Sequence, residues 1–192
     1  MKALIFLHFL FILISCGQTA QKSKLPMTSN HPPTFDRAHS NAKLLMNDSF
    51  FFDVIEETAP FGSDDGSDAY ASFSDWRKNH PSESPLNFLK QQINEWGYPK
   101  FDIEETELEK LKSYLKDDEM NIQFMKGIDQ AIVATAFGQL YLEGTVDNDI
   151  KELAKKSIYR ELLPEILKLW GDYARLREIN LNKLLGVLNK VK

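Results

Sequence analysis

Apolar side chains recur every three or four positions along the last two-thirds of the chain, which is the spacing of amphipathic α-helices. A helix over 69–78 places Phe73 and Trp76 on one face and ends before a His-Pro pair. Residues 121–143 are apolar on nearly all sides, which is typical of the helix at the centre of a bundle. The pattern predicts a mainly all-α fold, a multi-helix bundle around this central helix.

Capping residues indicate where several of these helices begin and end. Ser84 is expected to cap a helix that has Pro85 in its first turn and ends at Gly97. Thr106 and Glu109 have the spacing of a capping box ahead of another helix. These two helices fill the interval before the central helix.

Similar signals mark the helices that follow the central one. Gly144 is the predicted C-cap of the central helix, and Asp147 or Asn148 caps the next helix. Pro164 must kink or split that helix, because proline has no backbone N–H to donate and its ring clashes with the preceding turn. A last helix is expected over 172–190.

The region from residue 39 to residue 68 has no clear helical period. A short helix is expected over 42–46. Residues 50–55 form either a short strand or an extended buried segment, and so short an apolar run does not decide between them. An acidic loop over 60–68 follows. The globular helical domain is therefore predicted to cover residues 39–192.

The first 17 residues resemble the signal of a bacterial lipoprotein. Residues 3–14 are apolar apart from one histidine, and as a helix they rise roughly 18 Å, too little for the roughly 30 Å hydrocarbon core of a bilayer. The run Leu13-Ile14-Ser15-Cys16-Gly17 is similar to the lipobox, which implies cleavage just before Cys16 and lipid on its thiol. Residues 1–15 are then a signal peptide, and residues 16–38 are the lipidated cysteine and a flexible linker.

Two alternatives to lipidation remain, a plain secretory peptide cut elsewhere and an uncleaved short anchor. By resemblance to bacterial lipoproteins, Gly17 gives no signal for retention in an inner membrane. If the cell has two membranes, we therefore expect the chain at the outer membrane, facing the periplasm, and otherwise on the outer face of the cell membrane. The membrane, bound through lipid on Cys16, is its first predicted partner.

Composition and charge narrow the remaining partners. The chain is 43% hydrophobic, which is enough to build a core, and its net charge is −5, so nucleic acid is not expected as a partner. Residues 47–68 contain seven acids and no Lys or Arg, whereas residues 151–192 contain ten bases and five acids. We expect these two regions to meet in the fold and to compensate each other.

The acidic loop is the first candidate site. Asp64, Asp65 and Asp68 supply hard oxygen ligands of the kind that Ca²⁺ takes, but their spacing does not match the EF-hand pattern. Asp65 and Asp68 are instead expected to cap the helix that begins near Ala69, where free N–H groups favour carboxylates. This role leaves a binding role open for the rest of the loop, and no metal or other cofactor is predicted.

Asp129 is a second candidate, because it lies within the apolar central helix, where a carboxylate is costly unless it is paired. The arginines available on later helices are Arg160, Arg175 and Arg177. Two interpretations follow, a structural salt bridge or a ligand site in which an arginine binds a carboxylate or phosphate.

The sequence contains no recognised catalytic constellation. An acylated Cys16 leaves no free thiol, and His39 and His80 have no companion at a metal-ligand spacing such as HExxH. The GxSxG, GxxxxGK[ST] and GxGxxG patterns are all absent from the sequence.

Several runs resemble an uncharacterised bacterial family of the YfeS type. They are His39–Met46, Phe50–Asp53, Ala59–Asp68, Asp75–Arg77 and Ala131–Gly144. The resemblance covers about residues 39–190, and the Pro-Phe-Gly-x-Asp-x-Gly-x-Asp core is its most specific part. It implies no established activity, so no functional residue is carried over.

The predicted function is that of a membrane-tethered lipoprotein that binds or protects a protein partner without catalysis. It is motivated by the helical core, by the missing catalytic set, and by an acidic loop beside aromatics expected to be exposed, namely Phe61, Tyr70 and Trp76. The alternative is a carboxylate- or metal-dependent hydrolase of the cell envelope that uses the acids of the loop.

Overall fold

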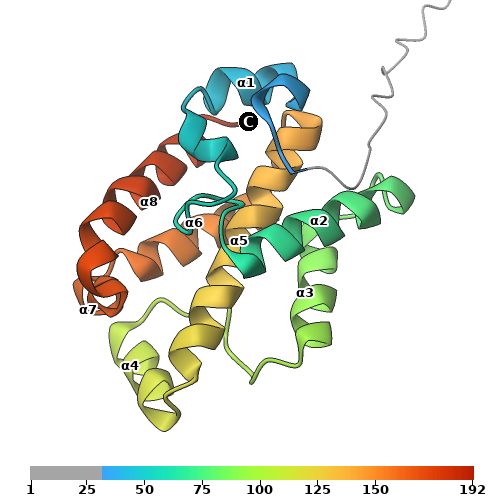
Figure 1. Ribbon diagram of the computed structural model, residues 1–192. Coiled ribbons are helices and arrows are strands. Elements are labelled where there is room, and N and C mark those ends of the chain that lie inside the picture. Colours follow the sequence, from blue (N-terminus) through green and yellow to red (C-terminus); the bar gives the residue numbers. More distant parts are fainter. Residues whose placement is uncertain (1–31) are drawn as a thin grey trace, which may run out of the picture.

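Helix α5 (Asn121–Glu143) runs through the middle of the fold in the computed structural model, which describes residues 32–192 (Figure 1). The stretch from Ala131 to Leu140 is buried on every side. The helix ends at Gly144, which adopts a left-handed conformation with φ of 76°. Both the bounds and the central position of this helix are confirmed.

The other helices pack around α5 and around one another. Helix α2 crosses α5 with the largest interface of the fold, and α6 and α3 also pack on α5 (Figure 1). Helix α8 packs on α6 at the far side of the bundle. The described residues are helical with no β-strand, so the predicted all-α fold is confirmed. The helices are α1 (Ser40–Leu45), α2 (Asp64–Asn79), α3 (Pro85–Trp96), α4 (Leu108–Asp117), α6 (Asn148–Glu161), α7 (Pro164–Leu167) and α8 (Ala174–Leu188).

Proline shapes the chain after α6 as the sequence predicted, and a glycine that was not singled out adds a turn there. Pro164 splits the helical pattern, so that α6 ends at Glu161 and the short helix α7 follows. The chain continues into a 3-10 segment, η3 (Lys168–Tyr173), in which Gly171 has a φ of 55°. Because of this segment α8 begins at Ala174, two residues later than predicted. The break turns the chain back towards the first half of α5.

The segment 50–55, expected as a short strand or an extended buried segment, is neither over its whole length, since no strand forms there and Val54 and Ile55 are exposed. Its first residues form a 3-10 turn, η2 (Ser49–Phe52). The turn is capped by Asp48, whose carboxylate accepts a hydrogen bond from the Phe50 N–H at 3.0 Å. Phe50 and Phe51 are buried in the core, and Phe51 stacks on Phe137 of α5 with 5.9 Å between ring centroids. Burial of aromatic side chains therefore explains the apolar run without sheet pairing.

Two predicted caps also need correction. Helix α2 begins at Asp64, not near Ala69, and its N-cap is Ser63, whose hydroxyl accepts a hydrogen bond from the Gly66 N–H at 3.0 Å. Asp64 and Asp65 lie in the first turn of the helix, where its dipole favours negative charge, and Asp68 lies within the helix, so neither Asp65 nor Asp68 is the predicted cap.

The capping box proposed at Thr106 does not form. Helix α4 has Glu107 at its N-cap position without a side-chain cap. The Glu105 carboxylate accepts the backbone N–H groups of Thr106 and Glu107 instead, at 2.9 and 2.7 Å.

The described packing begins slightly ahead of His39. A 3-10 turn, η1 (Phe35–Arg37), leads to the buried Ala38, and the Thr34 N–H donates to the Tyr141 hydroxyl at 3.2 Å. The predicted signal peptide, Cys16 and residues 17–31 of the linker lie outside the described residues. Between residues 32 and 192, no helix is both long enough and apolar enough to cross a membrane.

The acidic and basic regions do meet. Lys183 of α8 forms a salt bridge with Asp48 at 2.7 Å, and this hydrogen bond lowers the pKa of the Asp48 carboxyl. Arg177 of α8 donates to the backbone oxygen of Thr58 at 2.9 Å. The segment that leads into α2 is therefore held against α8.

Candidate functional site

Asp129 and Arg160 form a salt bridge whose two side chains are fully buried, as one of the two interpretations predicted. The Arg160 Nε also donates to Asp129 Oδ2 at 3.2 Å, and the Ser157 hydroxyl donates to Asp129 Oδ1 at 2.5 Å. Burial has the largest single effect and favours a lower pKa for Arg160, but the charge and hydrogen bond of Asp129, together with the nearby charges of Glu161 and Asp102, raise that pKa on balance.

The remaining donors of Arg160 are also occupied. Its Nη1 donates to the backbone oxygens of Ile103 and Glu105, at 3.2 and 2.6 Å, and so ties the segment before α4 to α6. Because these donors of Arg160 and the carboxylate of Asp129 are all hydrogen-bonded inside the protein, the salt bridge leaves no polar group for a ligand.

A second buried pair was not predicted. Arg177, considered as a partner for Asp129, pairs instead with Glu161, with Nε to Oε2 at 2.9 Å and Nη2 to Oε1 at 2.5 Å. Asn180 donates to the Thr58 hydroxyl at 2.6 Å, next to the bond from Arg177 to the Thr58 backbone oxygen. The two contacts at Thr58 hold the loop before α2 against α8.

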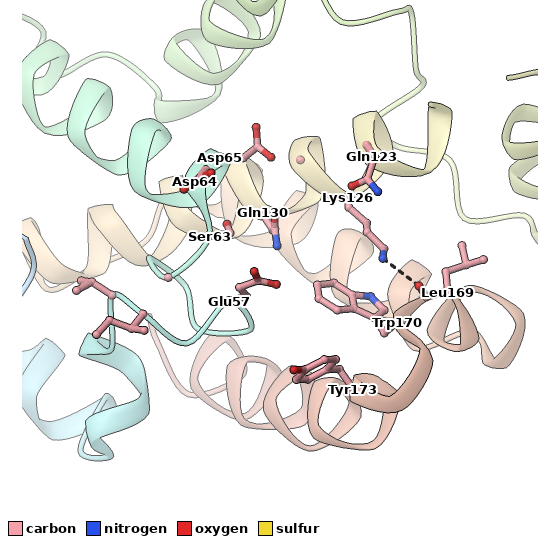
Figure 2. Close-up of a pocket in the computed structure, with 14 residues that line it drawn as sticks. Glu57, Ser63, Asp64, Asp65, Gln123, Lys126, Gln130, Leu169, Trp170 and Tyr173 are labelled. Atoms are coloured by element: carbon pink, nitrogen blue, oxygen red, sulfur yellow. Dashed lines mark hydrogen bonds between the residues drawn. The ribbon is translucent and has the colours of Figure 1, made fainter. Parts of the chain in front are cut away.

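A cleft of about 670 Å³ opens between three segments (Figure 2). One wall is the loop from Val54 through the first residues of α2, the second is the first half of α5, and the third is η3. Its volume lies within the range of roughly 300–1,000 Å³ that is usual for ligand sites. The cleft is the candidate functional site of the described residues.

The first wall is acidic. Glu57, Asp64 and Asp65 line it, and Figure 2 shows Glu57 projecting from the loop towards the middle of the cleft. Asp65 Oδ1 accepts a hydrogen bond from the Tyr98 hydroxyl at 2.7 Å. Burial, and then the bond to Asp65, raise the pKa of Tyr98 to about 12.

Asp65 also depends on a glycine of the second wall. A Cβ added at Gly127 of α5 would lie 2.7 Å from Asp65 Oδ2, closer than real contacts allow. The absence of a side chain at Gly127 thus lets the carboxylate lie directly on the α5 backbone. This close approach fixes the distance between the first two walls.

The opposite side of the cleft is cationic and aromatic. The Lys126 ammonium donates to the Leu169 backbone oxygen at 3.1 Å and lies 4.4 Å from the centre of the Trp170 ring (Figure 2). The side chain is half-buried, and this burial lowers the pKa of Lys126. Within residues 32–192 no carboxylate lies within 4.0 Å of its nitrogen.

Trp170 contacts two cations, because the Arg177 guanidinium also lies over its ring, at 4.7 Å from the centre. The indole Nε1 is buried and has no hydrogen-bond acceptor among the described residues. Trp170 therefore links the cleft to the buried pair of Arg177 and Glu161, and one of its polar atoms is unsatisfied.

The rim of the cleft is apolar and exposed. Ile55 is 86% exposed and Tyr173 is 66% exposed, and Val54 beside them is also exposed. Leu176 and Ile179 follow Tyr173 at three-residue intervals on α8 and are exposed as well. Large apolar side chains gathered at the edge of a cleft are typical of binding surfaces.

Only some of the predicted site residues lie in this cleft. Asp64 and Asp65 line it, whereas Asp68 is exposed on α2 outside it and Asp129 is buried elsewhere. Trp76 stacks on His80, 4.5 Å between ring centroids, in a separate smaller groove beside α3. The structure therefore does not bring the five predicted binding residues together.

The expected exposure of two aromatics is wrong. Phe61 and Tyr70 are buried and pack against each other, 4.8 Å between ring centroids, in the core beside Tyr141. Both rings instead belong to the hydrophobic core, where aromatic side chains remove a large apolar area from water. The aromatics that do face the cleft are Trp170 and Tyr173.

Lys126, Trp170 and Tyr173 were not found by sequence reasoning. A weak signal existed, since Lys126 is a cation within a largely apolar helix and Trp170-Gly171 follows a proline break. Among the described residues, no three His, Cys, Asp or Glu side chains gather into a group that could hold a metal ion.

Comparison with known proteins gives one informative match. The chain is 27% identical over 137 residues to the "Uncharacterized protein YfeS" of Escherichia coli (strain K12), which confirms the resemblance to the YfeS type. The match covers 70% of this chain and 54% of that protein, so the chain spans about half the length of this relative. No family model matches the chain. No solved structure matches it either.

Proposed function

We propose that the chain is a membrane-tethered lipoprotein whose helical domain binds a protein partner, without catalysis, at the cleft lined by α5, η3 and the loop before α2. The observation that carries the proposal is the exposed apolar rim, formed by Ile55 and Tyr173, around a cleft in which the Lys126 ammonium has no carboxylate partner from residues 32–192. Apolar surface beside a few polar groups is the usual composition of a binding site.

The tether rests on the sequence alone. The lipobox-like run places the only cysteine, Cys16, directly after a leader too short to span a bilayer. From Cys16 to the first described residue, Pro32, the chain has enough length to hold the domain some tens of ångströms from a bilayer.

The tether is tested by mass spectrometry of the N-terminal peptide from membranes. We expect acylated Cys16 as the first residue, and a Cys16→Ser variant that keeps its leader and carries no lipid. An unmodified cysteine in the parent protein would contradict the tether.

Partner binding is tested by photo-crosslinking from the rim of the cleft. A photoreactive phenylalanine analogue at Ile55 or Tyr173 is expected to capture a discrete partner in intact envelopes. The matched control is the same analogue at Glu109, whose side chain is 82% exposed on α4, away from the cleft. Identical crosslinking patterns from the rim and from Glu109 would refute the assignment of the cleft as the binding surface.

The alternative proposal is an envelope hydrolase that uses the cleft acids, and it is motivated by Asp64 and Asp65 sharing one wall. It predicts that Ca²⁺ or Mg²⁺ raises the melting temperature of the parent and not of Asp64→Ala. If neither ion shifts the melting temperature of the parent protein, a metal-dependent hydrolase is refuted.

A further inference from the structure

The cleft separates charges of opposite sign on facing walls. Glu57 and Asp64 belong to the loop and the start of α2, and no ion pair with either is formed within the described part of the chain. Lys126 projects from α5 on the other side, next to Trp170 of η3 (Figure 2). A ligand that carries both signs of charge, separated by an apolar part, would match this arrangement.

The Lys126 side has more hydrogen-bond donors than acceptors. An ammonium has three N–H donors, and the Leu169 backbone oxygen accepts one of them. The neighbouring Trp170 Nε1 is a buried donor that finds no acceptor between residues 32 and 192. Gln123 and Gln130 line the cleft on the same helix and add amide groups. What this side lacks is an oxygen with negative charge, which a carboxylate supplies in a charge-assisted hydrogen bond.

We propose that the cleft binds the C-terminal end of a peptide chain. Its carboxylate lies at Lys126, its last apolar side chain lies against Trp170 and Tyr173, and a preceding Lys or Arg faces Glu57 and Asp64. The inference rests on the proposed function and names the part of the partner that the cleft receives.

The size of the cleft favours a chain end over a free amino acid. About 670 Å³ is in the range of sites for drug-sized ligands, and a single amino acid would leave most of it filled with water. Exposed Ile55 at the rim offers further apolar surface to residues ahead of the last one.

The test uses the indole N–H signal of Trp170 as the readout. The chain has three tryptophans, so a ¹H–¹⁵N spectrum of the full chain in mild detergent shows three such signals, and a Trp170→Phe variant assigns the relevant one. Trp76 and Trp96 serve as internal controls. The probes are the dipeptide Lys-Phe, the same dipeptide with an amidated C-terminus, and free phenylalanine.

We expect Lys-Phe to shift the Trp170 signal at millimolar concentration, and the amide to bind at least about fivefold more weakly, because it offers no charged oxygen to Lys126. Lys126→Met should abolish the difference between acid and amide. The matched control, Lys90→Met on the exposed face of α3, should keep it. Glu57→Gln should weaken Lys-Phe, since one attraction for the basic side chain is lost.

Three results would overturn the inference. They are equal binding of acid and amide, no shift of the Trp170 signal with Lys-Phe up to about 20 mM, and free phenylalanine binding as tightly as Lys-Phe. None of these results would change the outcome of the crosslinking experiment at Ile55 and Tyr173. The proposal that the cleft binds a protein partner and the proposal that it binds a peptide C-terminus can therefore be refuted separately.

Discussion

The buried pair of Asp129 and Arg160 gives the sharpest prediction about stability. Asp129→Asn keeps the size of the side chain but removes the negative charge that faces a guanidinium with no solvent exposure. Removing one partner of a buried ion pair leaves an uncompensated charge, which costs roughly 3–5 kcal/mol. For a chain of this length, about 2–4 °C is lost for each kcal/mol, so we expect the melting temperature to fall by roughly 6–20 °C.

The assay is urea unfolding followed by circular dichroism at 222 nm, with the free energy of unfolding extrapolated to water. The matched control is Glu109→Gln, which breaks the exposed salt bridge to Lys112 at 2.9 Å and should cost less than about 1 kcal/mol. A cost below about 1 kcal/mol for Asp129→Asn would show that the buried charge is compensated in another way, and the reasoning would fail.

A double variant separates the charge from the packing. Asp129→Leu with Arg160→Met replaces the pair by apolar side chains and should recover part of the lost free energy, because no buried charge remains. Recovery should be incomplete, since the backbone oxygens of Ile103 and Glu105 lose their donor. A double variant as unstable as the sum of its single changes would contradict this account.

Two further predictions concern single contacts. In the same assay, the Gly127→Ala variant should be less stable than the Gly186→Ala variant by about 1 kcal/mol or more. The new Cβ at position 127 displaces the Asp65 carboxylate, whereas a Cβ at position 186 meets nothing within 4 Å. Equal stabilities of the two variants would refute the close contact. Asp48→Asn should lower stability at pH 7. Lys183 lowers the pKa of Asp48 in the folded state, so the stabilisation by the Asp48 carboxylate is present above its usual pKa of 3.8 and disappears as the pH falls below that value. A difference in stability between the parent and the variant that persists at pH 2 would contradict the assignment.

The central helix could be predicted because its signals are local. A long apolar run and a glycine with positive φ define α5 and its end at Gly144, and Ser84 and Pro85 define the start of α3 in the same way. The start of α2 was missed because Asp64, Asp65 and Gly66 are typical of loops. Their helical conformation follows from the Ser63 cap and from packing on α5, which local sequence does not show.

The cleft depended on contacts between distant residues, and it was therefore only half predicted. The composition of the loop indicated Asp64 and Asp65, but the opposite side of the cleft comes from Lys126, about 60 positions later, and from Trp170 and Tyr173, more than a hundred positions later. Trp170 reaches α5 only because the chain breaks at Pro164 and turns at Gly171. A lone lysine on an apolar helix gives no indication of such a neighbour, so the place of Lys126 in the cleft could be seen only from the structure.

Arg160 and Glu161 are adjacent on α6 and yet serve different parts of the fold. Arg160 holds α5 and the segment before α4, while Glu161 orients Arg177, which binds the loop of the acidic wall at Thr58. Two adjacent residues of α6 therefore help to hold the walls of the cleft in place before any ligand arrives. Because buried hydrogen bonds already brace these walls, a ligand spends less of its interaction free energy on ordering them.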